Sequence, residues 1–158
     1  MTRRGVVWAL IAAAVAFVLS LRYSGGLLPT EPPRTVHVVN LVSQPQCEPL
    51  GRTCRALAEG LTLGLQLPSE VPTMRGFPVL VEVAGEANAE IEAVLVEFTM
   101  EGMDMGVNRF RLARQQPGLW SGSVTLPVCT TGRRDWLAAV DADVGERRYR
   151  AQFQFRSQ

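Results

Sequence analysis

The stretch "LTLGLQL", residues 61–67, places a leucine at every second position. Side chains of a β-strand point alternately to the two faces of a sheet, so the four leucines of this stretch share one face. An amphipathic helix would instead repeat its apolar residues at intervals of three and four. The stretch therefore predicts a half-buried strand whose leucine face lies in the core.

Six further segments show the same two-residue period. They are "PVLVEV" (78–83), "IEAVLVEFTM" (91–100), "NRFRLAR" (108–114), "LWSGSVTL" (119–126), "DWLAAVDA" (135–142) and "RRYRAQFQF" (147–155). Short half-buried strands separated by Pro/Gly-containing turns are typical of sandwich folds. We therefore predict an all-β fold over residues 61–158, an antiparallel immunoglobulin-like β-sandwich of about seven strands. Outside the N-terminus, only "CRALAEGL" (54–61) suggests a single helical turn.

The N-terminal segment predicts the compartment. Residues 5–21 carry no charge and lie between the arginine pair Arg3–Arg4 and Arg22. This length reaches the lower limit for a membrane-spanning helix, about 17 residues, and exceeds the core of most signal peptides. We predict an uncleaved anchor over residues 1–22; a cleaved signal peptide is the alternative. The positive-inside rule then gives a single-pass protein of the bacterial inner membrane with its C-terminal domain in the periplasm.

Residues 23–60 are predicted to form a Pro/Gly-rich tether followed by a cysteine-containing loop. Residues 23–35 hold three prolines and two glycines without periodicity, and "CEPLGRTC" contains Cys47 and Cys54. A disulfide is expected in an oxidising compartment, and three cysteines allow three pairings. We favour Cys47–Cys54 because the two residues are close in sequence, which would leave Cys129 free.

Three methionines occur within "MEGMDMG", residues 100–106. If residues 108–126 form a hairpin that turns between Gln116 and Gly118, the position opposite Cys129 lies between Asp104 and Gly106. The free thiol would then lie beside the methionine-rich stretch. Thioether and thiolate sulfurs are soft donors that select Cu(I) over harder ions. Met103, Met105 and Cys129 are therefore candidate ligands, and Met100 could be a third thioether.

Two other interpretations of the methionines stay open. Methionine fills irregular gaps in cores, and Met100 continues the apolar face of the 91–100 strand. Methionine-rich patches also serve as adaptable contact surfaces for partner proteins. Catalysis is not expected, because His37 is the only histidine and the familiar enzyme motifs are missing. A net charge of +1 gives no indication of nucleic-acid binding.

These features together resemble the FixH/YtkA-like domains. The resemblance rests on the N-terminal anchor, the "MDM" of Met103–Met105 after a central strand, "GLWSG" (118–122) and "WLAAV" (136–140). It implies an extracytoplasmic immunoglobulin-like domain linked to copper handling or to the assembly of haem–copper oxidases. Because His37 lies outside the predicted sandwich, the resemblance would make Cys129 the replacement for a histidine ligand.

The sequence thus predicts a membrane-anchored periplasmic protein that binds Cu(I) and holds or delivers copper. The partner would be a membrane protein such as an oxidase under assembly. The alternative is a metal-free interaction or scaffolding module that contacts a membrane complex through the same surface.

Overall fold

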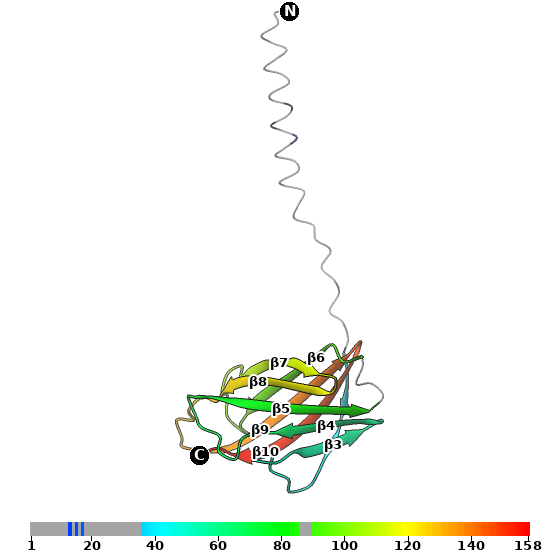
Figure 1. The fold of residues 1–158 in the computed structure, drawn as a ribbon. Coiled ribbons are helices and arrows are strands. Elements are labelled where there is room, and N and C mark those ends of the chain that lie inside the picture. Colours follow the sequence, from blue (N-terminus) through cyan, green and yellow to red (C-terminus); the bar gives the residue numbers. More distant parts are fainter. Residues whose placement is uncertain (1–12, 14, 16, 18–35, 86–89) are drawn as a thin grey trace, which may run out of the picture. The chain divides into compact units, whose positions relative to one another are not determined.

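A computed structural model of the chain describes residues 13, 15, 17, 36–85 and 90–158 (Figure 1). The predicted anchor, residues 1–22, lies outside the described residues except at three positions. Among the residues that the structure describes, no helix has the length and apolar character needed to cross a membrane. The compact unit that contains all the strands spans Thr35–Gln158.

Ten strands and no α-helix occur within residues 36–85 and 90–158, which confirms the all-β prediction. The strands are β1 (His37–Asn40), β2 (Val42–Ser43), β3 (Cys54–Ala58), β4 (Leu61–Gln66), β5 (Gly76–Gly85), β6 (Ala93–Thr99), β7 (Arg109–Gln116), β8 (Leu119–Thr125), β9 (Asp135–Val144) and β10 (Arg147–Arg156). Strands β4 to β10 correspond to the seven predicted segments. The first three come from residues 37–58, which the sequence assigned to the tether and the cysteine loop.

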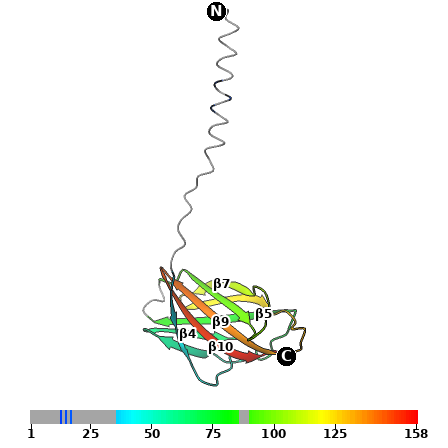
Figure 2. The same cartoon turned by 180° about the vertical axis from the view of Figure 1, so that it is seen from behind.

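The strands form one nearly closed sheet in the order β1-β10-β9-β6-β7-β8-β5-β4-β3-β2. Neighbouring strands run antiparallel, except that β1 is parallel to β10. The sheet bends at β7, whose residues 109–112 pair with β6 and whose residues 113–116 pair with β8. Figures 1 and 2 show the result: β8, β5, β4 and β3 lie across from β6, β9 and β10.

The short segment from β1 to β2 connects the two edges of the sheet. Strand β1 pairs with β10, the Leu41 amide donates to the Arg150 carbonyl, and β2 then pairs with β3. The Ser43 hydroxyl still donates to the Gln152 carbonyl of β10, at 2.6 Å. One continuous stretch of chain thus forms both edge strands, and it bonds to β10 through β1 and to β3 through β2.

A single apolar core fills the space between the two halves of the sheet. Its side chains come from the inward positions that the two-residue period predicted, such as Leu63 and Leu65 of β4, Phe98 of β6 and Phe155 of β10. The rings of Phe98 and Phe155 pack edge to face with centroids 6.0 Å apart. Burial of large apolar side chains is the main force that holds such a fold together.

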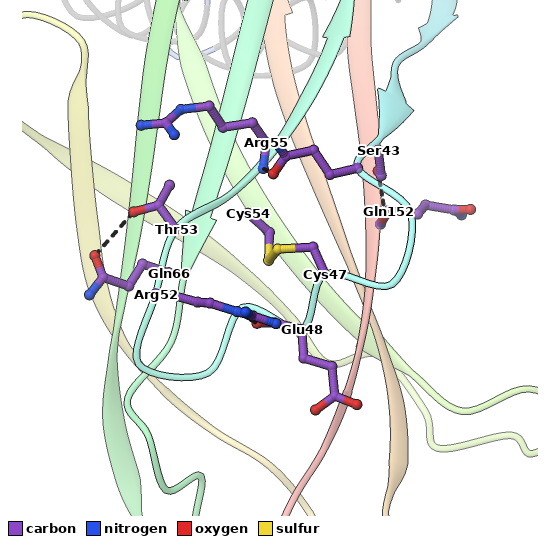
Figure 3. The surroundings of a disulfide bond; sticks show 10 residues. Ser43, Cys47, Glu48, Arg52, Thr53, Cys54, Arg55, Gln66 and Gln152 are labelled. Carbon is purple, nitrogen blue, oxygen red and sulfur yellow. Dashed lines mark hydrogen bonds between the residues drawn. A yellow bond between two sulfur atoms is a disulfide. The ribbon is translucent and has the colours of Figure 1, made fainter.

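The disulfide Cys47–Cys54 is present, which confirms the predicted pairing, and Cys129 is free. It connects the loop after β2 to the first residue of β3 (Figure 3). The helical turn suggested for residues 54–61 is wrong, because Cys54–Ala58 forms β3. Alternate residues Cys54 and Ala56 are buried, and β3 pairs with β4 on one side and β2 on the other.

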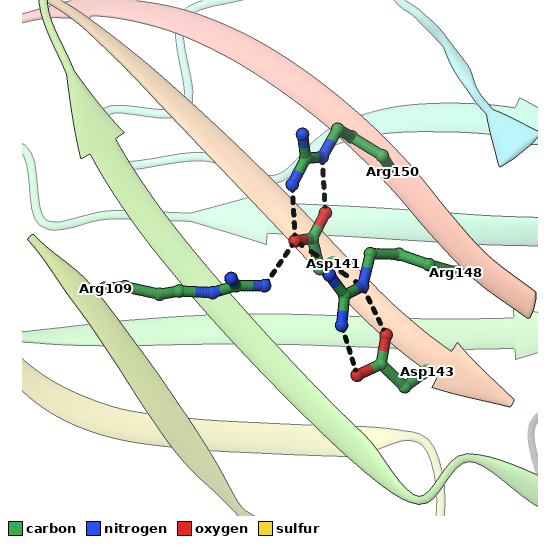
Figure 4. Close-up of polar contacts among 5 residues, drawn as sticks. All are labelled: Arg109, Asp141, Asp143, Arg148 and Arg150. Atoms are coloured by element: carbon green, nitrogen blue, oxygen red, sulfur yellow. Dashed lines mark hydrogen bonds and ion pairs between the residues drawn. The ribbon is translucent and has the colours of Figure 1, made fainter. Parts of the chain in front are cut away.

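A buried carboxylate lies on the outer face of β9, opposite the core. Asp141 is only 1% exposed, and both of its oxygens accept hydrogen bonds from Arg150 of β10, each at 2.7 Å. Arg109 of β7 donates to the same carboxylate at 2.9 Å, while Arg148 pairs with Asp143 (Figure 4). Burial of a charge costs free energy unless the charge is paired and hydrogen-bonded. Arg150 and Arg109 therefore stabilise the buried carboxylate of Asp141.

Candidate functional site

Two glycine-containing turns form the candidate site. The loop after β6 turns at once, because the Met103 amide donates to the Met100 carbonyl at 3.2 Å. Gly102 lies at the third position of this turn with φ of 73°, a conformation that favours glycine. The loop after β8 closes similarly, with the Gly132 amide donating to the Cys129 carbonyl at 3.0 Å. We refer to residues 100–103 as the methionine turn and residues 129–132 as the cysteine turn.

The two turns bring a thiol and a thioether into contact. Cys129 Sγ lies 3.2 Å from Met103 Sδ, within reach of a weak S–H···S hydrogen bond. The Cys129 side chain is 7% exposed, whereas Met103 is half-buried and packs against the edge of the core. The prediction that the free thiol lies beside the methionine-rich stretch is therefore confirmed.

The other two methionines are held differently. Met105 is also half-buried against the core while Asp104 between it and Met103 is exposed, as expected for an alternating segment. The Asn108 amide group donates to the Met105 carbonyl at 2.7 Å and holds this part of the loop. Met100 is 3% exposed and belongs to the core, where it continues the inward face of β6. This burial supports the packing interpretation of Met100.

Thr131 is a member of the site that the sequence analysis missed. Its hydroxyl lies 3.1 Å from Cys129 Sγ and 3.6 Å from Met103 Sδ. The hydrogen bond from this hydroxyl is the main reason why the pKa of the Cys129 thiol is lowered. Backbone hydrogen bonds and the positive charge of Arg133 act in the same direction, and burial opposes them. One hydroxyl oxygen thus contacts both sulfurs, and it makes the thiolate form of Cys129 easier to reach than in an ordinary cysteine.

Arg133 is a second member of the site that the sequence analysis missed. Its Nη1 donates to the Glu101 carbonyl in the methionine turn at 2.7 Å. Its Nε donates to Asp135 Oδ1 at 3.1 Å, and its Nη2 pairs with the other oxygen of Asp135. Arg133 holds the pKa of Asp135 down at about 2. One guanidinium therefore connects the methionine turn to the start of β9.

The sequence placed the residue opposite Cys129 between Asp104 and Gly106, and the observed contact falls one residue before this range, at Met103. Ala113 pairs with Ser121 and Arg114 with Trp120, so the β7–β8 hairpin turns between Gln116 and Gly118, as assumed. The ladder does not reach the site, because β7 leaves β8 at Ala113 and crosses to β6. The contact to Cys129 is therefore made between two loops and falls on Met103.

Among the residues that the structure describes, no group of three or more His, Cys, Asp or Glu side chains is placed to hold a metal ion. The candidate site consists instead of a thiol, a neighbouring thioether and a hydroxyl. Thiolate and thioether donors suit a soft ion.

No family model, curated protein or solved structure matches the chain. The resemblance to FixH/YtkA-like domains therefore remains a hypothesis that rests on the sequence motifs.

Proposed function

We propose that this protein is a membrane-anchored periplasmic Cu(I)-binding protein that holds copper or delivers it to a membrane protein. In this proposal residues 1–22 form the anchor, and the β-domain is an immunoglobulin-like sandwich that carries the ion at the loop end near Cys129. The proposed recipient, an oxidase under assembly, comes from the resemblance to FixH/YtkA-like domains.

One observation carries the proposal, the distance of 3.2 Å between Cys129 Sγ and Met103 Sδ. Two sulfurs that bind the same ion through bonds of about 2.3 Å can be at most about 4.6 Å apart. The observed pair lies within this limit. Met105 is the nearest further thioether along the chain, and like Met103 it is half-buried against the core.

The chemistry of the donors supports a soft monovalent ion as cargo. Thiolate and thioether bind Cu(I) well, and a lowered thiol pKa makes the thiolate form easier to reach. Glu101 and Asp104 are exposed beside the sulfurs and contribute negative potential that attracts a cation. A site at a loop end allows a partner to approach and exchange ligands one at a time.

The disulfide supports the proposed compartment. Cys47 and Cys54 form a disulfide bond. Disulfides form and persist in oxidising environments such as the bacterial periplasm. The disulfide also removes two competing thiols, so that Cys129 is the one free cysteine available to an ion.

The direct test is a Cu(I) titration of the full chain in detergent micelles, with ascorbate as reductant and a chromophoric Cu(I) chelator as competitor. We expect one ion per chain, and we expect Cys129→Ser or the double variant Met103→Leu/Met105→Leu to weaken binding by about tenfold or more, equivalent to about 1.4 kcal/mol. Met74→Leu is the matched control, because Met74 is 66% exposed and lies in the loop before β5.

Unchanged affinity in both the Cys129→Ser and the double-methionine variants would overturn the proposal. The metal-free interaction module would then be the better description of the methionine-rich loop.

A further inference from the structure

Arg133 makes contacts that go beyond a surface ion pair. Its guanidinium is held in one orientation because Nε and Nη2 both bond to the Asp135 carboxylate. A forked pair of this kind fixes the plane of the group as well as its position. The remaining Nη1 is then directed at the Glu101 carbonyl, 2.7 Å away.

The location of Glu101 makes this contact relevant to the sulfur site. Glu101 is the second residue of the methionine turn, between Met100, which is anchored in the core, and Met103, which contacts the thiol. Glu101 and Gly102 are exposed, and a Cβ atom added at Gly102 would meet no other atom within 4 Å. Packing therefore does little to hold the outer part of the turn, and the arginine supplies a specific contact.

We propose that Arg133, oriented by Asp135, is a positioning residue that clamps the methionine turn against the cysteine turn and keeps Met103 over the Cys129 thiol. The clamp is a property of the metal-free protein. Its consequence for the ion rests on the proposed Cu(I) function: a clamped turn presents both sulfurs together, and a released turn presents the thiol alone.

The clamp can be tested without metal through the rate at which iodoacetamide alkylates Cys129 in the full chain. The other two cysteines form the disulfide, so they do not react. We expect Arg133→Gln to raise the rate about three- to tenfold, since loss of a partly exposed charged hydrogen bond shifts a local opening equilibrium by this order. Loss of the positive charge alone would make the thiolate less favoured and slow the reaction.

Arg133→Lys separates geometry from charge. Lysine keeps the charge but cannot make the fork to Asp135 and also reach Glu101, so we expect a rate close to that of Arg133→Gln. Asp135→Asn, which keeps the arginine and removes its anchor, should change the rate in the same direction. Arg134→Gln is the matched control, because Arg134 is the adjacent exposed arginine, and it should leave the rate unchanged.

Rates equal to that of the unmodified protein in both Arg133 variants would overturn the clamp. A normal rate in Arg133→Lys together with a slower rate in Arg133→Gln would also overturn it, because charge alone would then be the cause. Cu(I) affinity is measured on the same variants, and Arg133→Lys should weaken it about threefold or more. If the unmodified chain binds no Cu(I), the proposed function fails while the alkylation rates still decide the clamp.

Discussion

At the scale of single residues, the environment of Cys129 differs from that of an inert core cysteine. A buried thiol in apolar surroundings has a raised pKa and reacts slowly. Here the Thr131 hydroxyl and the Met103 sulfur both lie against Sγ, and the pKa of the thiol is lowered. The side chain that packs under the loop is therefore a free thiol whose pKa lies below its ordinary value, not above it.

Thr131→Val tests this environment, because valine keeps the branched shape and removes the hydroxyl. The folded pKa of the thiol should rise, since the hydrogen bond that favours the thiolate is lost. The pH profile of iodoacetamide alkylation should then shift to higher pH, with slower reaction at neutral pH. Thr130→Val at the adjacent exposed position is the control and should leave the profile in place. If the profile of Thr131→Val is as unshifted as that of Thr130→Val, the Thr131 hydroxyl does not lower the pKa of the thiol.

At the scale of elements, the seven strands β4 to β10 were predictable, whereas β3 and most of the loop contacts were not. Alternating apolar residues, as in β4, specify both the strand and its buried face. Strand β3 was missed because five residues are too few to distinguish the two-residue period from a helical turn, and its stability comes from pairing on both sides. Thr131 and Arg133 were missed because their contacts depend on how two loops meet, and no local pattern encodes that.

A buried carboxylate on the outer face of the sheet helps to hold three strands together. Asp141 of β9 ties β10 and β7 together through Arg150 and Arg109. Asp141→Asn leaves the arginines without their shared charge partner, and we expect it to lower the free energy of unfolding by about 3 kcal/mol. Urea denaturation followed by tryptophan fluorescence measures this loss.

The control for Asp141 is Glu82→Gln. Glu82 makes an exposed ion pair with Arg55 at 3.6 Å, so its replacement should cost less than about 1 kcal/mol. Equal losses in the two variants would mean that the arginines around Asp141 add no more than a surface pair.

At the scale of the whole molecule, the β-domain and the N-terminal segment are separable units. The contacts of the chain divide it between Arg34 and Thr35, and the apolar core formed by the described residues belongs to the second unit. The disulfide closes a loop at the start of β3 and joins two residues of this second unit. The β-domain should therefore fold without residues 1–34, while its location should depend on them.

Deletion of residues 1–34 tests the proposed anchor. When both are expressed in a bacterium, the full chain should sediment with membranes and resist extraction by high salt, and the truncated chain should be in the cytosolic fraction. Deletion of residues 23–34 alone keeps the anchor and should leave the protein in the membrane fraction.

The number of free thiols after denaturation reports the compartment independently. We expect one thiol for an exported chain with Cys47–Cys54 oxidised, and three for a chain kept in the reducing cytosol. A full chain found in the soluble periplasm with one thiol and a shortened N-terminus would identify residues 1–22 as a cleaved signal peptide, and the site near Cys129 would then belong to a diffusible carrier.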